Sequence, residues 1–206
     1  VWQTSWGFST RSIGGLILAH GDDNGLRLPP NLAPFQVVII PVKTDPELIK
    51  KSREYSDRLK GSGVRVLIDD REDETLGYKI NKWELKGIPI RLELGAKELA
   101  EDTVTLVRRD NGEKIKIPAG NIIDAIKTTF VSIQSGMLAE SQKFLEENTV
   151  RLNTYDEFKT VMEGSRGFIK AHWCESAECE AKIKSETKAT TRCRLLDERE
   201  ESGKCI

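Results

Sequence analysis

The chain has 206 residues, of which 38% are hydrophobic and 32% are charged, so it has the composition of a globular protein of one or two domains. Its 32 Lys and Arg residues nearly balance 33 Asp and Glu residues, and this excludes a general attraction to nucleic acid, including DNA. The longest apolar stretches, 16–19 and 37–42, are far shorter than the roughly 20 residues that cross a bilayer, and no signal peptide opens the chain. We therefore expect a cytoplasmic protein without membrane contacts.

The first twenty residues predict a strand that leads into a short helix. Small, polar and aromatic residues alternate from Gln3 to Ser9, as in a strand that lines a pocket, and an apolar helix follows over 13–18. Arg11 lies at the junction. A guanidinium beside the free N–H groups of a helix N-terminus suits a triphosphate or an adenine ring. An exposed arginine with no ligand is the alternative.

A second domain is expected to begin after a proline-rich linker at 28–34. The apolar run 36–42 has the length of a strand that is buried on both faces of a partly parallel sheet. Residues 44–47, Thr-Asp-Pro-Glu, then form a capping box that starts a helix, and Gly61 and Gly63 end it. The apolar face of this helix comprises Leu48, Tyr55 and Leu59.

Strand and helix signals alternate through the rest of this domain. The expected elements are strands at 64–69, 88–94 and 103–109 and helices at 75–86 and 121–147. The sequence Asp110-Asn111-Gly112 predicts a tight hairpin after the third of these strands, and Trp83 falls on the apolar face of its helix. We therefore predict an α/β fold with a mixed sheet and flanking helices.

The last third of the chain contains all four cysteines. Residues 154–157 form another capping box, the helix that they start ends at Gly164, and 167–173 have a strand-like pattern. The cysteines lie at positions 174, 179, 193 and 205. They predict one tetrahedral zinc site, to which His172 could contribute, or else reduced free thiols. A disulfide is not expected, because nothing marks the chain as secreted.

The N-terminal motif resembles a known family. Ser5-Trp-Gly-Phe-Ser-Thr-Arg-Ser-Ile-Gly-Gly15, His20-Gly-Asp-Asp-Asn-Gly-Leu26 and Leu28-Pro-Pro30 are similar to the third class II signature motif of prolyl-tRNA synthetases. The similarity continues through Trp83-Glu-Leu-Lys-Gly-Ile-Pro89 to the last cysteine. It points to the branch of the family in which the catalytic core leads into an anticodon-binding domain and then a zinc-bearing C-terminal domain.

The resemblance implies that the chain is a fragment of a longer enzyme and that it has three parts. These are a catalytic-core remnant with motif 3 and a linker at 1–33, an anticodon-binding domain at 34–149, and a small α+β C-terminal domain with a truncated zinc-binding region at 150–206. A start at Val1 in the middle of a motif fits this expectation. The isolated fragment is expected to be inactive, because the contacts of motifs 1 and 2 would be missing, and the complete enzyme is expected to be a homodimer.

The resemblance also implies an activity, which is the ligation of proline to tRNA(Pro). Proline attacks ATP, with Mg²⁺, to give prolyl-adenylate, and the tRNA then accepts the prolyl group. Arg11 is implied as a catalytic residue that binds ATP together with Ser9, while Trp6 and Gly7 would line the proline and adenylate pocket. The alternative is an accessory RNA- or protein-binding module with an anticodon-binding fold and no chemistry.

A mixed charge pattern over 77–97 suits RNA. Lys79, Lys82, Lys86, Arg91 and Lys97 supply positive charge, which Glu84 and Glu93 interrupt. A carboxylate can accept from the N1 and N2 donors of an unpaired guanine, and a cation can donate to its O6 and N7 atoms. The resemblance implies that Glu84, Arg91 and Lys97 read the two guanines of the proline anticodon. A solvated helix face beside a sheet edge is the alternative.

The resemblance narrows the zinc ligands. Cys174 and Cys179 match the family's Cys-x4-Cys pair, and Cys205 matches the first residue of a Cys-x2-Cys pair whose second member would follow Ile206. Cys193 is then expected on a strand, as a buried apolar side chain that binds no metal. A domain that is held together by zinc alone would need a complete ligand set.

Overall fold

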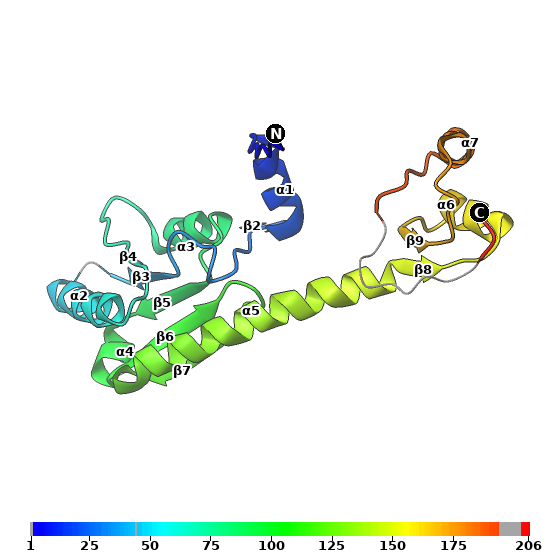
Figure 1. Ribbon diagram of the computed structural model, residues 1–206. Coiled ribbons are helices and arrows are strands. Elements are labelled where there is room, and N and C mark those ends of the chain that lie inside the picture. The colour runs from blue at the N-terminus through cyan, green and yellow to red at the C-terminus, as the bar shows by residue number, and fades with distance from the viewer. Residues whose placement is uncertain (1, 44, 194–202) are drawn as a thin grey trace. The chain divides into compact units, whose positions relative to one another are not determined.

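The computed structural model describes residues 2–43, 45–193 and 203–206 and divides into two compact units, Val1–Leu138 and Ala139–Ile206 (Figure 1). The first unit contains α1 (Arg11–His20), β1 (Gly21–Asp22), β2 (Gly25–Leu26), β3 (Val37–Pro41), α2 (Pro46–Gly61), β4 (Val66–Ile68), α3 (Leu76–Leu85), β5 (Ile90–Leu94), α4 (Ala96–Ala100), β6 (Thr103–Arg108), β7 (Lys114–Pro118), a 3-10 turn (Ala119–Asn121) and most of α5 (Ile122–Glu147). The second unit contains the end of α5, β8 (Thr149–Arg151), α6 (Tyr155–Glu163), β9 (Phe168–Lys170) and α7 (Ala177–Thr187).

The helix predicted after Arg11 is confirmed as α1, but the strand predicted before it is wrong. Residues 2–9 adopt no regular structure and are exposed, with Trp6 at 96% and Phe8 at 92% exposure. A strand needs a neighbour for its main-chain hydrogen bonds, and none of the described strands pairs with this segment. The pattern of side chains alone could not supply that partner.

The first unit is built on a five-stranded mixed sheet with the order β4-β3-β5-β6-β7. β3 is parallel to β4 and β5, while β6 is antiparallel to both β5 and β7. Every residue of β3 is buried, as its apolar run predicts for a strand with neighbours on both sides and helices on both faces. The predicted α/β fold, the mixed sheet and the hairpin at 110–112 are confirmed.

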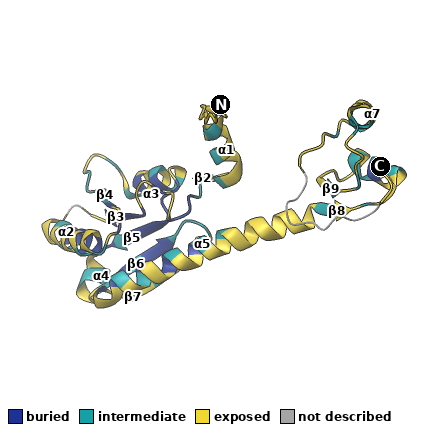
Figure 2. Ribbon diagram, viewed as in Figure 1, coloured by how far each residue is buried: buried dark blue, intermediate teal, exposed yellow. Residues whose placement is uncertain are grey.

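Two hydrophobic layers cover the two faces of this sheet. Val37 and Ile39 belong to the larger cluster, which includes side chains from α2 and α5, whereas Val38 and Ile40 pack with Trp83 of α3. Figure 2 shows strands of the sheet in the colour of buried residues. The alternation of side chains along β3 therefore separates the two layers. In the parallel register, Val38 lies beside Arg91 and Ile40 beside Glu93 of β5. These two charged side chains consequently share the α3 face of the sheet.

The helix boundaries follow their caps. Asp45, and not Thr44, is the N-cap of α2, because its carboxylate accepts from the N–H of Glu47 at 2.8 Å, and Thr44 lies outside the described residues. Thr75 caps α3 by accepting from the N–H of Tyr78 at 3.3 Å, and Gly87 follows its C-terminus with a φ of +72°. The predicted buried residues of α2 are confirmed: Leu48, Tyr55 and Leu59.

The predicted linker has no regular structure, yet it is fixed to the first unit. Arg65 donates to the carbonyl oxygens of Pro30 at 3.0 Å and Ala33 at 2.8 Å, and Gln36 donates to Pro30 at 3.1 Å. Pro30 and Ala33 are buried. The prolines therefore end regular structure, as predicted, but the segment packs as an ordered connection.

The second unit is small and has few buried side chains. β8 pairs with β9 in parallel, and α6 begins at the predicted cap, where Thr154 accepts from the N–H of Glu157 at 3.4 Å. Tyr155 and Lys159 of α6 both contact Glu186 of α7, at 2.8 and 2.9 Å. Among the described helices of the chain, none combines the length and apolar character that a membrane crossing requires.

Candidate nucleic-acid interface and thiol cluster

Arg91 is the centre of the candidate nucleic-acid interface. Its Nη1 donates to Glu84 Oε1 at 2.8 Å, and its Nε donates to Glu93 Oε1 at 2.9 Å. Glu84 comes from the last turns of α3 and Glu93 from the same face of β5, so a helix and a strand bring the three charges together. The structure therefore brings two of the three predicted reading residues, Glu84 and Arg91, into contact.

The two carboxylates around Arg91 differ in their access to solvent. The side chain of Arg91 is 10% exposed, that of Glu93 is 18% exposed and that of Glu84 is 34% exposed. A guanidinium with so little access to water is costly without partners, and its two ion pairs offset that cost. Glu84 is thus the most accessible member of the group to a ligand, while Glu93 holds Arg91 from the strand.

A depression of about 10 Å³ beside this pair is lined by side chains that include Trp83, Glu84, Arg91 and Arg109. This volume suits one water molecule and not a nucleobase. The depression is therefore too small to enclose a base.

Trp83 is a core residue, as predicted from its place on the apolar face of α3. It is buried, and its Nε1 donates to Asp69 Oδ2 at 2.6 Å. Burial raises the pKa of Asp69, but hydrogen bonds from Arg71 and Trp83 outweigh this effect and lower that pKa below its usual value. Asp69 thus has a structural role, because it binds the Trp83 side chain of α3.

Lys97, the third predicted reading residue, does not belong to the ion-pair group of Arg91. It is exposed on α4, which the sequence pattern missed, since Lys97 was expected in a loop. Within the described part of the chain, no hydrogen bond or ion pair joins Lys97 to Glu84 or Arg91. The signal for α4 was Glu98, three residues after Gly95, whose N–H donates to Glu98 Oε2 at 3.1 Å.

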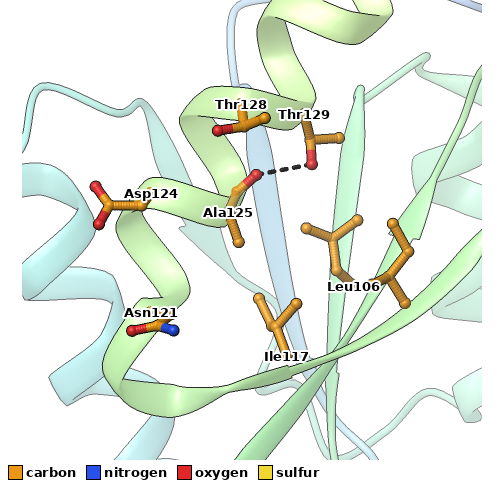
Figure 3. A pocket seen from close by; sticks show the side chains of 8 residues that line it. Leu106, Ile117, Asn121, Asp124, Ala125, Thr128 and Thr129 are labelled. Carbon is orange, nitrogen blue, oxygen red and sulfur yellow. Dashed lines mark hydrogen bonds between the residues drawn. The ribbon is translucent and has the colours of Figure 1, made fainter.

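A larger hollow of about 460 Å³ lies on the opposite face of the sheet, between α5 and strands β6 and β7 (Figure 3). Leu106 and Ile117 form part of its apolar floor, and Asn121, Asp124 and Thr128 form its polar rim. Its lining contains one carboxylate and no cation, and the Oγ1 of Thr129 is already bonded to the carbonyl of Ala125 at 2.7 Å. This lining does not suit a phosphate, so the hollow is not part of the nucleic-acid interface.

The residues that the motif assigns to ATP and proline lie around the start of α1. Arg11 is the first residue of the helix, and the main-chain carbonyl of Ser9 accepts from the side chain of Ser12 at 2.7 Å. Trp6, Gly7, Ser9 and Arg11 are all exposed. At this helix start the N–H groups of Ser12 and Ile13 already donate to the carbonyl oxygens of Ser9 and Thr10, both at 3.1 Å. None of the four assigned residues lines either of the two hollows described above.

Three cysteines of the second unit form a cluster. The sulfur atoms of Cys174, Cys179 and Cys205 all lie within 4.8 Å of one another. The main-chain N–H of Cys174 donates to the Sγ of Cys205 at 3.4 Å, and the N–H of Ile206 donates to the carbonyl of His172 at 3.1 Å. These bonds join the C-terminal segment to the segment after β9 that carries Cys174.

The fourth cysteine is separate, and two expectations about it are wrong. Cys193 is exposed and not buried, and it adopts no strand, because no described segment pairs with it. His172 also lies outside the sulfur cluster. The three sulfur atoms that come together are those that the resemblance implied as ligands, whereas the surroundings expected for Cys193 were wrong.

The donor set of the cluster fits a zinc ion. Zinc prefers sulfur ligands in a tetrahedral arrangement, and three converging sulfur atoms provide three of its positions. A hydrogen bond from the main chain of Ser176, with further bonds from the thiols of Cys205 and Cys179, lowers the pKa of Cys174, while its bond to Cys174 raises the pKa of Cys179. Such bonds favour a thiolate at Cys174, which is the form that binds metal.

Comparisons with known proteins agree across the two units. A family described as an anticodon binding domain matches residues 36–129, and a family described as prolyl-tRNA synthetase, C-terminal, matches residues 155–206. The proline–tRNA ligase of Natranaerobius thermophilus is 46% identical, and proline–tRNA ligase 2 of Clostridioides difficile is 44% identical. Both alignments cover 100% of this chain and 43% of the relative, so the chain spans less than half the length of these proteins.

Solved structures give the same result. The chain resembles the crystal structure of prolyl-tRNA synthetase from Cryptosporidium parvum complexed with halofuginone and AMPPNP, with 39% identity and a TM-score of 0.81. The same enzyme complexed with L-proline and AMP gives 38% identity and a TM-score of 0.82. These alignments cover 87% of this chain and 37% and 39% of the solved chains. The chain therefore belongs to the prolyl-tRNA synthetase family and corresponds to its C-terminal region.

Proposed function

We propose that this chain is the tRNA-reading part of a proline–tRNA ligase, which activates proline with ATP and transfers it to tRNA(Pro). The observation that carries this proposal is the Arg91–Glu84 pair, which lies at the surface of the anticodon-binding domain with its carboxylate partly exposed. The relatives also match the segment before residue 36, which a module that only binds RNA or protein would not need.

The pair has the chemistry to recognise an unpaired guanine. The carboxylate of Glu84 accepts from the two donors on the Watson–Crick edge of the base, and a cation beside it donates to O6 and N7. Adenine lacks this combination of groups, so it would leave a partly buried charge without its partner. Lys97, which follows β5 on the exposed side of α4, is the third reading residue that we propose.

For the activation of proline, we assign the residues around the start of α1. Arg11 and Ser9 would hold ATP, and Trp6 and Gly7 would line the proline and adenylate pocket. Mg²⁺ would neutralise charge on the phosphates when it is bound. No side chain need act as a nucleophile, because this reaction requires orientation of the reactants and electrostatic stabilisation by Arg11.

We assign a structural zinc ion to Cys174, Cys179 and Cys205. It would cross-link the segment around Cys174 to the C-terminal segment, and another donor would complete the tetrahedron. We further propose boundaries near residues 33 and 149 between a core segment, the anticodon-binding domain and the C-terminal domain. A homodimeric enzyme in the cytoplasm completes the proposal.

Binding of RNA tests the interface directly. Arg91→Ala should weaken binding to a stem-loop with the guanine-bearing proline anticodon by roughly 1–3 kcal/mol, and discrimination against a guanine-to-adenine change should fall. Glu84→Gln should lose discrimination as well, because an amide accepts without the favourable charge. Lys51→Ala on α2 is the control, and equal losses for Lys51→Ala and Arg91→Ala would contradict the proposal.

Adenylate formation tests the assigned activity. In the complete gene product, Arg11→Ala should slow proline-dependent pyrophosphate exchange by at least about tenfold, because roughly 1.4 kcal/mol of transition-state stabilisation corresponds to that factor. The affinity for the anticodon stem-loop should stay unchanged. A wild-type enzyme with stem-loop binding and no exchange activity would instead identify a binding module.

A further inference from the structure

Two arginines, one on β5 and one directly after β6, bind different groups of the same α3 residue, Glu84. Arg91 of β5 pairs with the carboxylate of Glu84 at 2.8 Å. Arg109, which directly follows β6, donates its Nε to the main-chain carbonyl of Glu84 at 3.1 Å. The N–H of Gly87 donates to this carbonyl as well, at 2.9 Å. The helix end that carries Glu84 is thus bonded from outside the helix, where its own carbonyl groups lack helical partners.

Arg109 is itself fixed by Asp22. Its Nη1 and Nη2 donate to the two carboxylate oxygens of Asp22, at 2.9 and 2.6 Å, and its side chain is 9% exposed. Asp22 also accepts from the N–H of Asn24 at 2.9 Å, and the hydrogen bonds from Arg109 lower its pKa. This fork-shaped pairing sets both the position and the plane of the guanidinium. A lysine could not reproduce it.

The backbone of β2 makes a second, independent contact at the same helix end. A Cβ atom on Gly25 would lie 2.4 Å from the Cα of Leu85, and one on Gly87 would lie 2.6 Å from the Cβ of Leu26. Both glycines have positive φ angles, +123° and +72°, which side chains rarely allow. The N–H of Leu28 donates to the carbonyl of Gly87 at 3.3 Å. The hairpin of β1 and β2 therefore packs directly against the residue that follows Glu84.

We propose that Arg109 and Asp22 are positioning residues for guanine recognition. They hold the last turn of α3, so that Glu84 and Arg91 meet the base in one fixed geometry. This inference rests on the proposed function of the Glu84–Arg91 pair. A preorganised pair loses less freedom when it binds, and the advantage applies to the matched base, which uses both groups together. Loss of the clamp should therefore weaken the matched complex more than the mismatched one.

The test uses the 206-residue chain and two synthetic stem-loops. One carries the guanine-bearing proline anticodon, and the other has one guanine replaced by adenine. Arg109→Gln should weaken the matched complex about fivefold, as expected for the loss of about one typical hydrogen bond, and leave the mismatched complex unchanged. Asp22→Asn should weaken the matched complex by a smaller factor and should likewise leave the mismatched complex unchanged. Arg65→Gln is the matched control, because Arg65 also donates to main-chain carbonyls, those of Pro30 and Ala33, and does not touch α3.

The ratio of the two affinities separates positioning from general loss of structure. A variant with less folded protein would bind both stem-loops more weakly by the same factor, so its ratio would stay at the wild-type value. If Arg109→Gln does not fold, Asp22→Asn decides, because the side chain of Asp22 is 31% exposed and lies outside the five-stranded sheet. A wild-type ratio in Asp22→Asn and Arg109→Gln, together with a reduced ratio in Arg91→Ala, would overturn the positioning role alone. A wild-type ratio in Arg91→Ala would overturn the proposed function, and the positioning role with it.

Discussion

Different interactions stabilise each of the two units of the chain. The first unit encloses a sheet in which strand β3, between β4 and β5, is buried along its whole length, with apolar layers on both faces. In the described part of the second unit, Phe158 is the one buried hydrophobic side chain, and α6 and α7 meet through charged and polar groups. The first unit can therefore rely on hydrophobic burial, which supplies most of the stability of a folded domain.

The second unit lacks such a core and has three converging thiols in its place. Small domains that bury little apolar surface generally need a disulfide or a metal to remain folded. A zinc ion on Cys174, Cys179 and Cys205 would supply this cross-link, since metal binding to a site that the unfolded chain lacks adds to the folding free energy. The comparison predicts that the two units respond differently to the same perturbation.

Removal of metal should have the largest effect, and it should be confined to the second unit. When a chelator is added to the zinc-loaded chain, amide hydrogen exchange should become fast in α6 and α7 and stay slow in β3 and β5. The reason is that the second unit would lose its main cross-link, whereas the first unit has its own core. Unchanged protection of α6 and α7 in the chelated chain would contradict this interpretation.

Cysteine variants give the matched control for the metal. Cys179→Ser should lower the zinc content and expose α7 in the same way as the chelator. Cys193→Ser should leave both unchanged, because Cys193 lies outside the sulfur cluster. A loss of zinc in Cys193→Ser would show that the ion uses a different ligand set.

A cavity in the first unit should cost the next largest amount. Ile39 is fully buried at the centre of the sheet, so Ile39→Ala should lower the free energy of unfolding of this unit by about 2–5 kcal/mol. Urea unfolding followed by hydrogen exchange would assign the loss to the first unit. The second unit should keep its wild-type stability, and a loss shared by both units would show that they unfold as one.

The sequence was informative where a local signal and the tertiary structure agree. The apolar run of β3, the capping box at 154–157 and the hairpin at 110–112 each specify one local geometry, and all three are confirmed. Predictions from the side-chain pattern were wrong where a strand needed a neighbouring strand. The expected strands before Arg11 and around Cys193 have no neighbour within the described structure, and α4, with five residues, is too short for a periodic signal.

The candidate site shows the same limit. The residue types near Arg91 suggested a guanine reader, but their mutual ion pairs depend on the way α3 packs on β5. Arg109 and Asp22 are separated by 87 positions in the chain, so no local pattern could indicate their contact. Only the folded structure brings them to the same helix end.

The buried carboxylate of Asp69 should give a smaller effect that depends on pH. Because the folded-state pKa is lowered, its stabilisation is fully present above the unfolded pKa of about 3.9 and is lost as the pH falls through the folded value. Asp69→Asn should therefore cost about 1–3 kcal/mol at pH 7, through its charged hydrogen bonds with Arg71 and Trp83. In urea titrations, the difference from wild type should shrink below pH 4. A difference that is constant from pH 7 to pH 3 would assign the loss to packing.

The smallest expected effects come from the removal of one helix cap in each unit, which should cost both units a similar free energy of unfolding. Asp45 caps α2 and Thr154 caps α6, each through a side-chain oxygen that accepts from a main-chain N–H. Replacement of either by alanine should cost about 1 kcal/mol. In the first unit, whose stability rests on the buried sheet, this loss multiplies a very small open population, so β3 should remain protected from hydrogen exchange. In the metal-free second unit, where little apolar surface is buried, the same loss should populate open forms of α6 several-fold more, since about 1.4 kcal/mol corresponds to a factor of ten. If zinc supplies the missing stability, the effect of Thr154→Ala on the exchange of α6 should become small again in the zinc-loaded chain. An equal effect with and without zinc would mean that α6 opens independently of the thiol cluster.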